Sequence, residues 1–174
     1  METRHAIKQD SASAEPPEPP HQIFLANEQQ TLAIDASRLT AAVRSVLEDS
    51  PYEQATVSVA LVDDPTIHAL NRRYLEHDYP TDVLSFVLED DGRRLHGELV
   101  ASADTAARNA VEYGWSAEDE LLLYLVHGAL HLVGHRDAEP AEIAAMRRAE
   151  AVQLAKLGVA LPADHMTLVE EGRR

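Results

Sequence analysis

The segment HGALHLVGHRD, residues 127–137, carries the side chains best suited to chemistry in this sequence. His127 and His131 lie four positions apart in an almost wholly apolar stretch, so a helix would point both imidazoles the same way. Two aligned nitrogen donors suit a zinc ion. Because two hydrogen-bonded core histidines would show the same spacing, the pair alone leaves both interpretations open.

Gly134 adds a turn that can complete a metal site. A glycine three residues after His131 can end the helix with a positive φ and return the chain, which brings Asp137 towards the histidines. A catalytic zinc needs three protein ligands and one open position, where bound water becomes the nucleophile. His135 is a competing third ligand, and two histidines with one carboxylate would also suit non-haem iron.

The spacing HxxxHxxGxxD is also that of the extended zinc proteases. In those enzymes a glutamate directly after the first histidine acts as general base. Gly128 occupies that position here. A peptidase of that type would need its general base from elsewhere in the chain. The residues therefore favour a chemistry other than that of these proteases.

Length and charge limit the classes of function. The 174 residues suit one domain with a single sizeable core. Fifteen Lys and Arg against thirty Asp and Glu give a formal net charge of −15, which repels phosphate backbones and anionic membranes, so any RNA site must be local. The absence of cysteine excludes disulfides, thiolate metal sites and cysteine nucleophiles.

We expect neither a membrane-spanning segment nor a secretory signal in this sequence. Its most apolar stretch, residues 121–134, is shorter than the roughly twenty apolar residues of a membrane-spanning helix. The N-terminus lacks the apolar core of a secretory signal, so we expect a cytoplasmic protein. Residues 1–21, rich in proline and acid, are expected to form a disordered tail before a domain at 22–174.

Apolar spacing predicts the elements that must position the histidine motif. Strands are expected at 23–26, 56–62, 83–87 and 98–101, and helices at 37–48, 64–74, 102–113, 116–133 and 140–157. Ser116 is the expected N-cap of the motif helix, and Gly134 ends it. This order indicates an α+β or α/β domain. We expect α+β, with a small mixed sheet of about four strands covered by helices and the metal-binding helix buried at its centre.

The motif resembles the HGxLHLxGYDH signature of the YbeY family of bacterial single-strand-specific metallo-endoribonucleases. LNRRY at 70–74, with PTDVLSF at 80–86, resembles a second block of that family, and GELV at 97–100 resembles a third. Glu142, Met146 and Glu150 on the last predicted helix fit as well. The likeness runs in family order from about Val57 to Leu157, and several independent motifs together identify the chain as similar to this family.

The resemblance implies one zinc ion per subunit and hydrolysis of single-stranded RNA. We expect no DNA substrate and no membrane partner. The resemblance also implies roles in 3′-end maturation of small-subunit ribosomal RNA and in ribosome quality control, with rRNA and the small subunit as partners. Carried over by position, His127 and His131 are the first two metal ligands. Asp137 stands where the family has a third histidine.

A second departure concerns a cation. Leu75 stands where the family has an arginine suited to holding phosphate or stabilising transition-state charge. Arg72, Arg73 and Arg136, inside or beside the motifs, are the candidate phosphate contacts.

Some polar residues of the motifs have simpler roles. Thr81, Asp82 and Ser85 are expected to shape the floor of the cleft rather than react. Glu98 could relay a proton, but it is more simply a polar strand residue.

Two other functions remain open at the level of sequence. One is another zinc metallohydrolase of the peptidase type. The other is a non-catalytic ribosome-assembly factor with a structural metal, for which His135 would be the fourth ligand.

Overall fold

Four strands and five helices follow one another in the described part of the chain, residues 19–75, 78–79 and 81–162 of a computed structural model. In chain order they are β1 (His21–Asn27), α1 (Ala36–Glu48), β2 (Gln54–Val62), α2 (Asp64–Leu75), β3 (Val83–Asp90), β4 (Arg94–Ser102), α3 (Ala103–Tyr113), α4 (Ala117–Leu132) and α5 (Pro140–Lys156). These elements confirm the α+β class. The expected tail falls mostly in residues outside the described ranges, whereas His21 already lies in β1.

The strands extend beyond the apolar segments that predict them. β4 begins at Arg94 rather than Glu98, because the backbone around Arg94 pairs with Gln54 of β2. Backbone pairing does not depend on apolar side chains, so polar strand ends escape a search for alternating hydrophobic residues.

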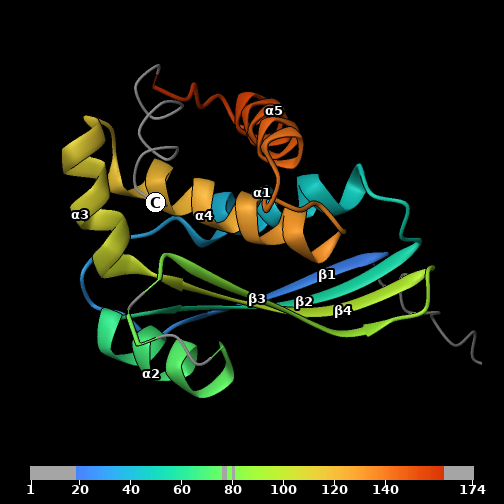
Figure 1. Cartoon of the computed structure of the whole chain (residues 1–174), viewed down its shortest axis with the longest axis horizontal. Helices are drawn as coiled ribbons and strands as arrows, with labels where there is room; N and C mark the ends of the chain where they lie inside the picture. The colour runs from blue at the N-terminus through green and yellow to red at the C-terminus, as the bar shows by residue number, and fades with distance from the viewer. Residues whose placement is uncertain (1–18, 76–77, 80, 163–174) are drawn as a thin grey trace, which may run out of the picture.

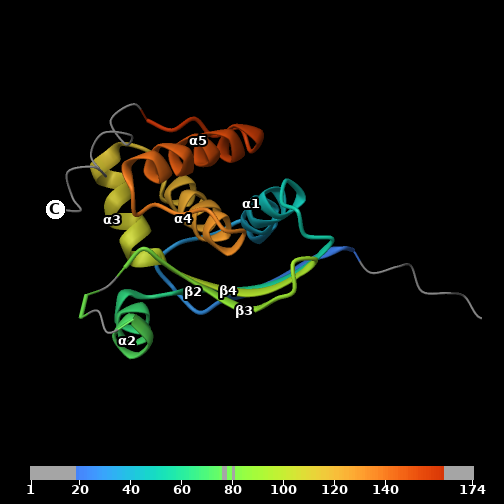
Figure 2. The same ribbon diagram turned by 45° about the vertical axis from the view of Figure 1, so that its right-hand side comes forward.

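The four strands form one mixed sheet in the order β1-β2-β4-β3. β1, β2 and β4 run parallel, and β3 pairs antiparallel with β4 at one edge. Figure 1 shows α1, α4 and α5 over one face of this sheet and α2 against the opposite face. Figure 2 shows that α4 lies between the sheet and α5, so the predicted burial of the motif helix is confirmed.

The caps of α4 are those that the sequence predicts. Ser116 Oγ accepts a hydrogen bond from the Asp119 backbone N–H at 3.0 Å, which caps the first turn. At the other end Gly134 has a φ of +97°, and the His135 N–H donates to the Leu130 carbonyl at 2.9 Å. No helix in the described ranges is long and apolar enough to span a bilayer.

Gly128 lets α4 approach the sheet very closely. A Cβ atom at Gly128 would lie 2.9 Å from Leu99 Cδ2, 3.0 Å from Ser85 Oγ and 3.1 Å from Val83 Cγ2. Gly97 on β4 makes the matching approach, since its Cβ would lie 2.9 Å from a methyl group of α4. Glycine inside a helix costs about 1 kcal/mol relative to alanine, so this close packing must offset that cost.

Gly128→Ala should therefore destabilise the protein, although alanine is the better helix former. Overpacking of a tight core costs about 1–3 kcal/mol, and we expect a net loss of free energy of unfolding in urea titrations. Leu99→Val removes the methyl group nearest to the new Cβ, so the double variant should be less destabilised than the sum of the single variants. A stabilising effect of Gly128→Ala, or strict additivity, would contradict this account of the contact.

Candidate metal centre

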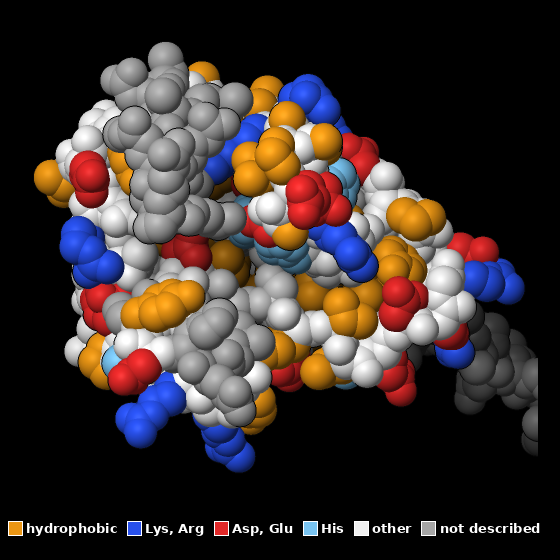
Figure 3. Space-filling view, viewed as in Figure 1, with side chains coloured by type: hydrophobic (Ala, Val, Ile, Leu, Met, Phe, Trp, Pro, Cys, Tyr) orange, Lys and Arg blue, Asp and Glu red, His pale blue; other side chains and the backbone are white. Residues whose placement is uncertain are grey.

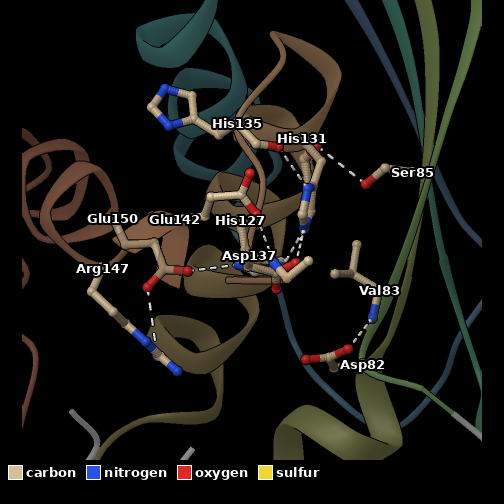
Figure 4. A network of polar contacts seen from close by, with 12 residues as sticks. Asp82, Val83, Ser85, His127, His131, His135, Asp137, Glu142, Arg147 and Glu150 are labelled. Carbon is tan, nitrogen blue, oxygen red and sulfur yellow. Dashed lines mark hydrogen bonds and ion pairs between the residues drawn. The ribbon is translucent and has the colours of Figure 1, made fainter. Parts of the chain in front are cut away.

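Three side chains converge at the C-terminal end of α4 (Figure 4). His127 and His131 project from the helix, with their Nε2 atoms 3.0 Å apart. Asp137 returns from the following loop, with one carboxylate oxygen 3.7 Å from His127 Nε2 and the other 3.8 Å from His131 Nε2. One ligand atom from each residue lies within 4.8 Å of the others, so the three form a possible metal site.

The opposite nitrogen of each imidazole is already engaged. His127 Nδ1 donates to Glu150 Oε1 of α5 at 2.6 Å, and His131 Nδ1 donates to the backbone carbonyl of His135 at 3.0 Å. Carboxylate and carbonyl oxygens only accept, so the proton of each neutral ring lies on Nδ1. Both Nε2 lone pairs then face the same small space, an arrangement that a shared cation stabilises. The residues present therefore fit a metal ion.

The loop that carries Asp137 is held at both ends. At its start, the turn at Gly134 returns the chain towards α4. At its end, Glu142 in the first turn of α5 accepts hydrogen bonds from the backbone N–H groups of Ala138 and Glu139, both at 3.1 Å. These contacts fix the position of the carboxylate over the two histidines.

The site is open to solvent on one side. The exposed fractions of the side chains are 16% for His127, 24% for Asp137 and 30% for His131, so a substrate can reach all three. Figure 3 shows histidine side chains in the hollow at the centre of this face, with basic and acidic groups around it.

The comparisons with known proteins agree with the motifs. The family model described as Endoribonuclease YbeY matches residues 24–158, which is most of the chain. The chain belongs to the YbeY family. The resemblance drawn from the motifs is thereby confirmed.

Relatives that carry the name Endoribonuclease YbeY differ in how much of their length aligns. The protein from Rhodopirellula baltica is 51% identical over 112 residues, which cover 63% of this chain and 58% of that protein. The protein from Salinibacter ruber is 37% identical over 143 residues, covering 78% of this chain and 91% of that protein. The solution structure of TM1509 from Thermotoga maritima, at 24% identity and a TM-score of 0.50, covers 82% of this chain and 99% of its own, and supports the fold.

His135 does not join the metal group of this YbeY-family chain. Its ring points away from Asp137 (Figure 4), into a separate cleft of about 350 Å³ between the end of α1 and α5. Its contribution to the site is the backbone carbonyl that orients His131. Among the residues that the structure describes, the group therefore holds three ligands and no fourth.

Glu150 is the part of the site that sequence reasoning missed. Glu150 belongs to the pattern on the last helix that resembles the family, but the sequence pattern predicts no contact between it and a histidine. It is only 2% exposed and lies on the buried side of α5 with Met146 and Leu154. An acid at helical spacing among buried apolar residues is the signal that could have found it, because buried carboxylates need a partner.

The motif residues around the floor have structural contacts. Asp82 Oδ1 accepts from the Val83 N–H at 2.8 Å and from Thr81 Oγ1 at 3.0 Å. Ser85 Oγ donates to the Gly128 carbonyl at 3.1 Å. These bonds shape the start of β3 beneath the site, in agreement with the expected role.

Glu98 lies away from the metal group. Its neighbours Gly97 and Leu99 face α4, so the alternation of the strand places Glu98 on the opposite face of the sheet. It is exposed there and lines a cleft with Phe24. A proton relay from Glu98 to the metal group is thus wrong on geometric grounds.

The three candidate arginines occupy different places. Arg72 and Arg73 are exposed in the last turn of α2, and α2 covers the face of the sheet opposite α4. The Arg73 guanidinium lies 5.2 Å from the centre of its neighbour's ring, that of Tyr74. Arg136 is exposed on the loop itself, directly before Asp137. Leu75, at the position of the family's arginine, is the last residue of α2.

A buried tyrosine on α4 stays neutral close to the site. Burial raises the pKa of the Tyr124 phenol well above its usual range, and the carboxylates of Glu120 and Asp82 raise it further. Asn109 of α3 donates to the phenol oxygen at 2.8 Å. Tyr124 therefore joins α3 to α4 and has no part as a base at neutral pH.

A metal titration separates the two candidate third ligands. Asp137→Ala should lower the affinity for Zn²⁺ by more than about 100-fold, because it removes a direct ligand. Substitution of a residue that only hydrogen-bonds to a ligand typically lowers metal affinity by about 10–100-fold. His135→Ala should keep the affinity, because its contact with His131 uses the backbone. Competition with a chromogenic chelator measures both. Loss of zinc in the histidine variant with retention in the aspartate variant would reverse the assignment.

Proposed function

We propose that this chain is a zinc-dependent, single-strand-specific endoribonuclease that acts in 3′-end maturation of small-subunit rRNA and in ribosome quality control. The observation that carries the proposal is the open His127, His131 and Asp137 group in a member of the YbeY family. Relatives with the name endoribonuclease support hydrolysis of RNA phosphodiester bonds. One zinc ion per subunit, association with the ribosomal small subunit and a cytoplasmic location are parts of the same proposal.

A divalent metal bound here supplies Lewis-acid activation of water and of a phosphoryl oxygen. His127 and His131 hold their Nε2 lone pairs in fixed directions because Glu150 and the His135 carbonyl bind the opposite nitrogens. Asp137 adds a negative charge opposite the histidines. Two imidazoles and one carboxylate suit zinc and iron equally, so the ligands alone do not select the metal. We propose zinc because the family resemblance implies it.

The peptidase alternative conflicts with the packing of α4. A protease of the extended type places its glutamate base at the position of Gly128. In this chain a side chain there would meet Leu99, Ser85 and Val83 at 2.9–3.1 Å from its first carbon. The position is closed by the sheet, so the base of such a peptidase has no room.

A purely structural metal is also disfavoured. Structural zinc sites normally have four protein ligands and no open position. The described residues supply three, and the expected fourth ligand, His135, points into another cleft. The open side of the group fits catalysis better than a role limited to assembly.

Removal of either histidine should abolish both metal binding and hydrolysis. His127→Ala and His131→Ala each delete one of two donors that share a single ion, while the packing of α4 against the sheet is retained. Elemental analysis and cleavage of an end-labelled single-stranded RNA measure the two losses, and circular dichroism checks the fold. Chelation of the wild-type metal should also lower its thermal stability, because the ion binds the native state. Full nuclease activity in a metal-free variant would refute the mechanism.

RNA binding should be confined to a local basic site, because the chain carries a net charge of −15. Few phosphate contacts are then made, so the affinity should fall only weakly as salt rises. Arg136→Ala should raise KM for RNA and reduce the slope of log affinity against log salt by about 0.7, the value for one phosphate contact on a single strand. Arg72→Ala and Arg73→Ala, on the opposite face of the sheet, are the matched controls and should change both quantities less. A larger effect of the α2 variants would place the RNA path on the other face.

A further inference from the structure

Arg147 is the ionic partner of the glutamate behind His127. The two residues lie three positions apart on α5, and Arg147 Nη1 is 3.6 Å from Glu150 Oε2 (Figure 4). Both side chains are shielded from solvent, with exposed fractions of 14% for Arg147 and 2% for Glu150. A contact chain therefore runs from Arg147 through Glu150 to a metal ligand.

The two carboxylate oxygens of Glu150 differ in their hydrogen bonding. Oε1 accepts the 2.6 Å hydrogen bond from His127 Nδ1. Oε2 is buried and has no hydrogen-bond partner among the described residues, and the Arg147 guanidinium lies next to it. An uncompensated buried carboxylate is strongly unfavourable, and an opposite charge at this distance reduces that penalty.

We propose that Arg147 is a positioning residue of the metal centre. By compensating the charge of Glu150, it keeps the carboxylate in the pocket behind His127 and so keeps His127 Nε2 directed at the metal. Arg147 then sets metal affinity without touching a ligand. The inference rests on the metal site of the proposed function, and it names a residue that the family motifs do not include.

The neighbouring residue supplies a matched control. Arg148 is exposed on the same turn of α5 and lines the cleft that holds the His135 ring. It has the same charge and side chain as Arg147, but in the described part of the structure it forms no ion pair with Glu150. A general effect of lowering the positive charge of α5 would affect both positions, whereas the proposed role affects Arg147 alone.

The test is zinc affinity of the full chain, measured by competition with a chromogenic chelator. Glu150→Gln should weaken binding about 10–100-fold, as for other residues that orient a ligand. Arg147→Gln, which removes the charge and keeps a polar side chain, should also weaken zinc binding, but by less than Glu150→Gln, because it acts on the ligand only through the glutamate. Arg147→Lys, which keeps the positive charge, should retain most of the wild-type zinc affinity. Arg148→Gln should leave the zinc affinity unchanged.

Two further readouts separate positioning from simple stabilisation. The visible spectrum of the Co²⁺-loaded protein reports ligand geometry, and it should change in Arg147→Gln and not in Arg148→Gln. The double variant Arg147→Gln with Glu150→Gln should bind zinc no more weakly than Glu150→Gln alone, because Arg147 acts through the glutamate.

The possible outcomes distinguish this inference from the proposed function. Wild-type zinc affinity and an unchanged Co²⁺ spectrum in Arg147→Gln would overturn the role of Arg147, as would additive effects in the double variant. If Arg147→Gln does not fold, failure of the folded Arg147→Lys variant to retain zinc affinity would overturn it equally. Absence of metal from the wild-type chain would refute the proposed function and this inference together. Tight zinc binding without RNA cleavage would refute the function alone.

Discussion

The burial of α4 on two sides is the constraint on which the rest of the molecule depends. The sheet contacts one side of the helix at Gly128, and α5 covers another. A helix in that position has little surface left for polar groups. The two histidines therefore lie at the end of the helix where the covering elements separate, and each ring must find a hydrogen-bond acceptor outside α4.

Those acceptors join the fold to the site. The glutamate that satisfies His127 also fixes how α5 sits against α4, and the carbonyl that satisfies His131 belongs to the turn that brings Asp137 back. Hydrogen bonds that a buried helix needs for its own stability are thus the bonds that select the Nδ1–H form of each imidazole. The same few hydrogen bonds therefore stabilise the fold and orient the two histidines for metal binding.

Local signals were enough to predict much of this arrangement. The cap at Ser116 and the turn at Gly134 determine the ends of α4, and the spacing of His127, His131 and Asp137 follows from helix and turn geometry. Long-range features could not be obtained in that way. The pairing of β3 with β4 is a local hairpin, but the strand order β1-β2-β4-β3 depends on the parallel pairing of β2 with β4, which α2 and β3 separate along the chain. The contact of His127 with Glu150 likewise joins two different helices.

The arginines illustrate the same difference. Arg72 and Arg136 are both close to family motifs in sequence, yet α2 and the metal loop lie on opposite faces of the sheet. Which face a helix covers is decided by the connection between strands and by packing, and proximity along the chain carries no information about it. Alternation within β4, by contrast, would have been enough to place Glu98 away from the histidines.

The double anchoring of the loop after α4 has an evolutionary consequence. Since Gly134 and Glu142 hold its backbone independently of the side chain at position 137, the third donor can be exchanged without rebuilding the domain. Aspartate in place of the family's histidine makes the site one unit more negative while the scaffold is preserved. If a metal ion is bound here, an exchange between Asp and His at position 137 would change the charge of the site, and with it the acidity of a water on the metal, while the loop kept both of its anchors.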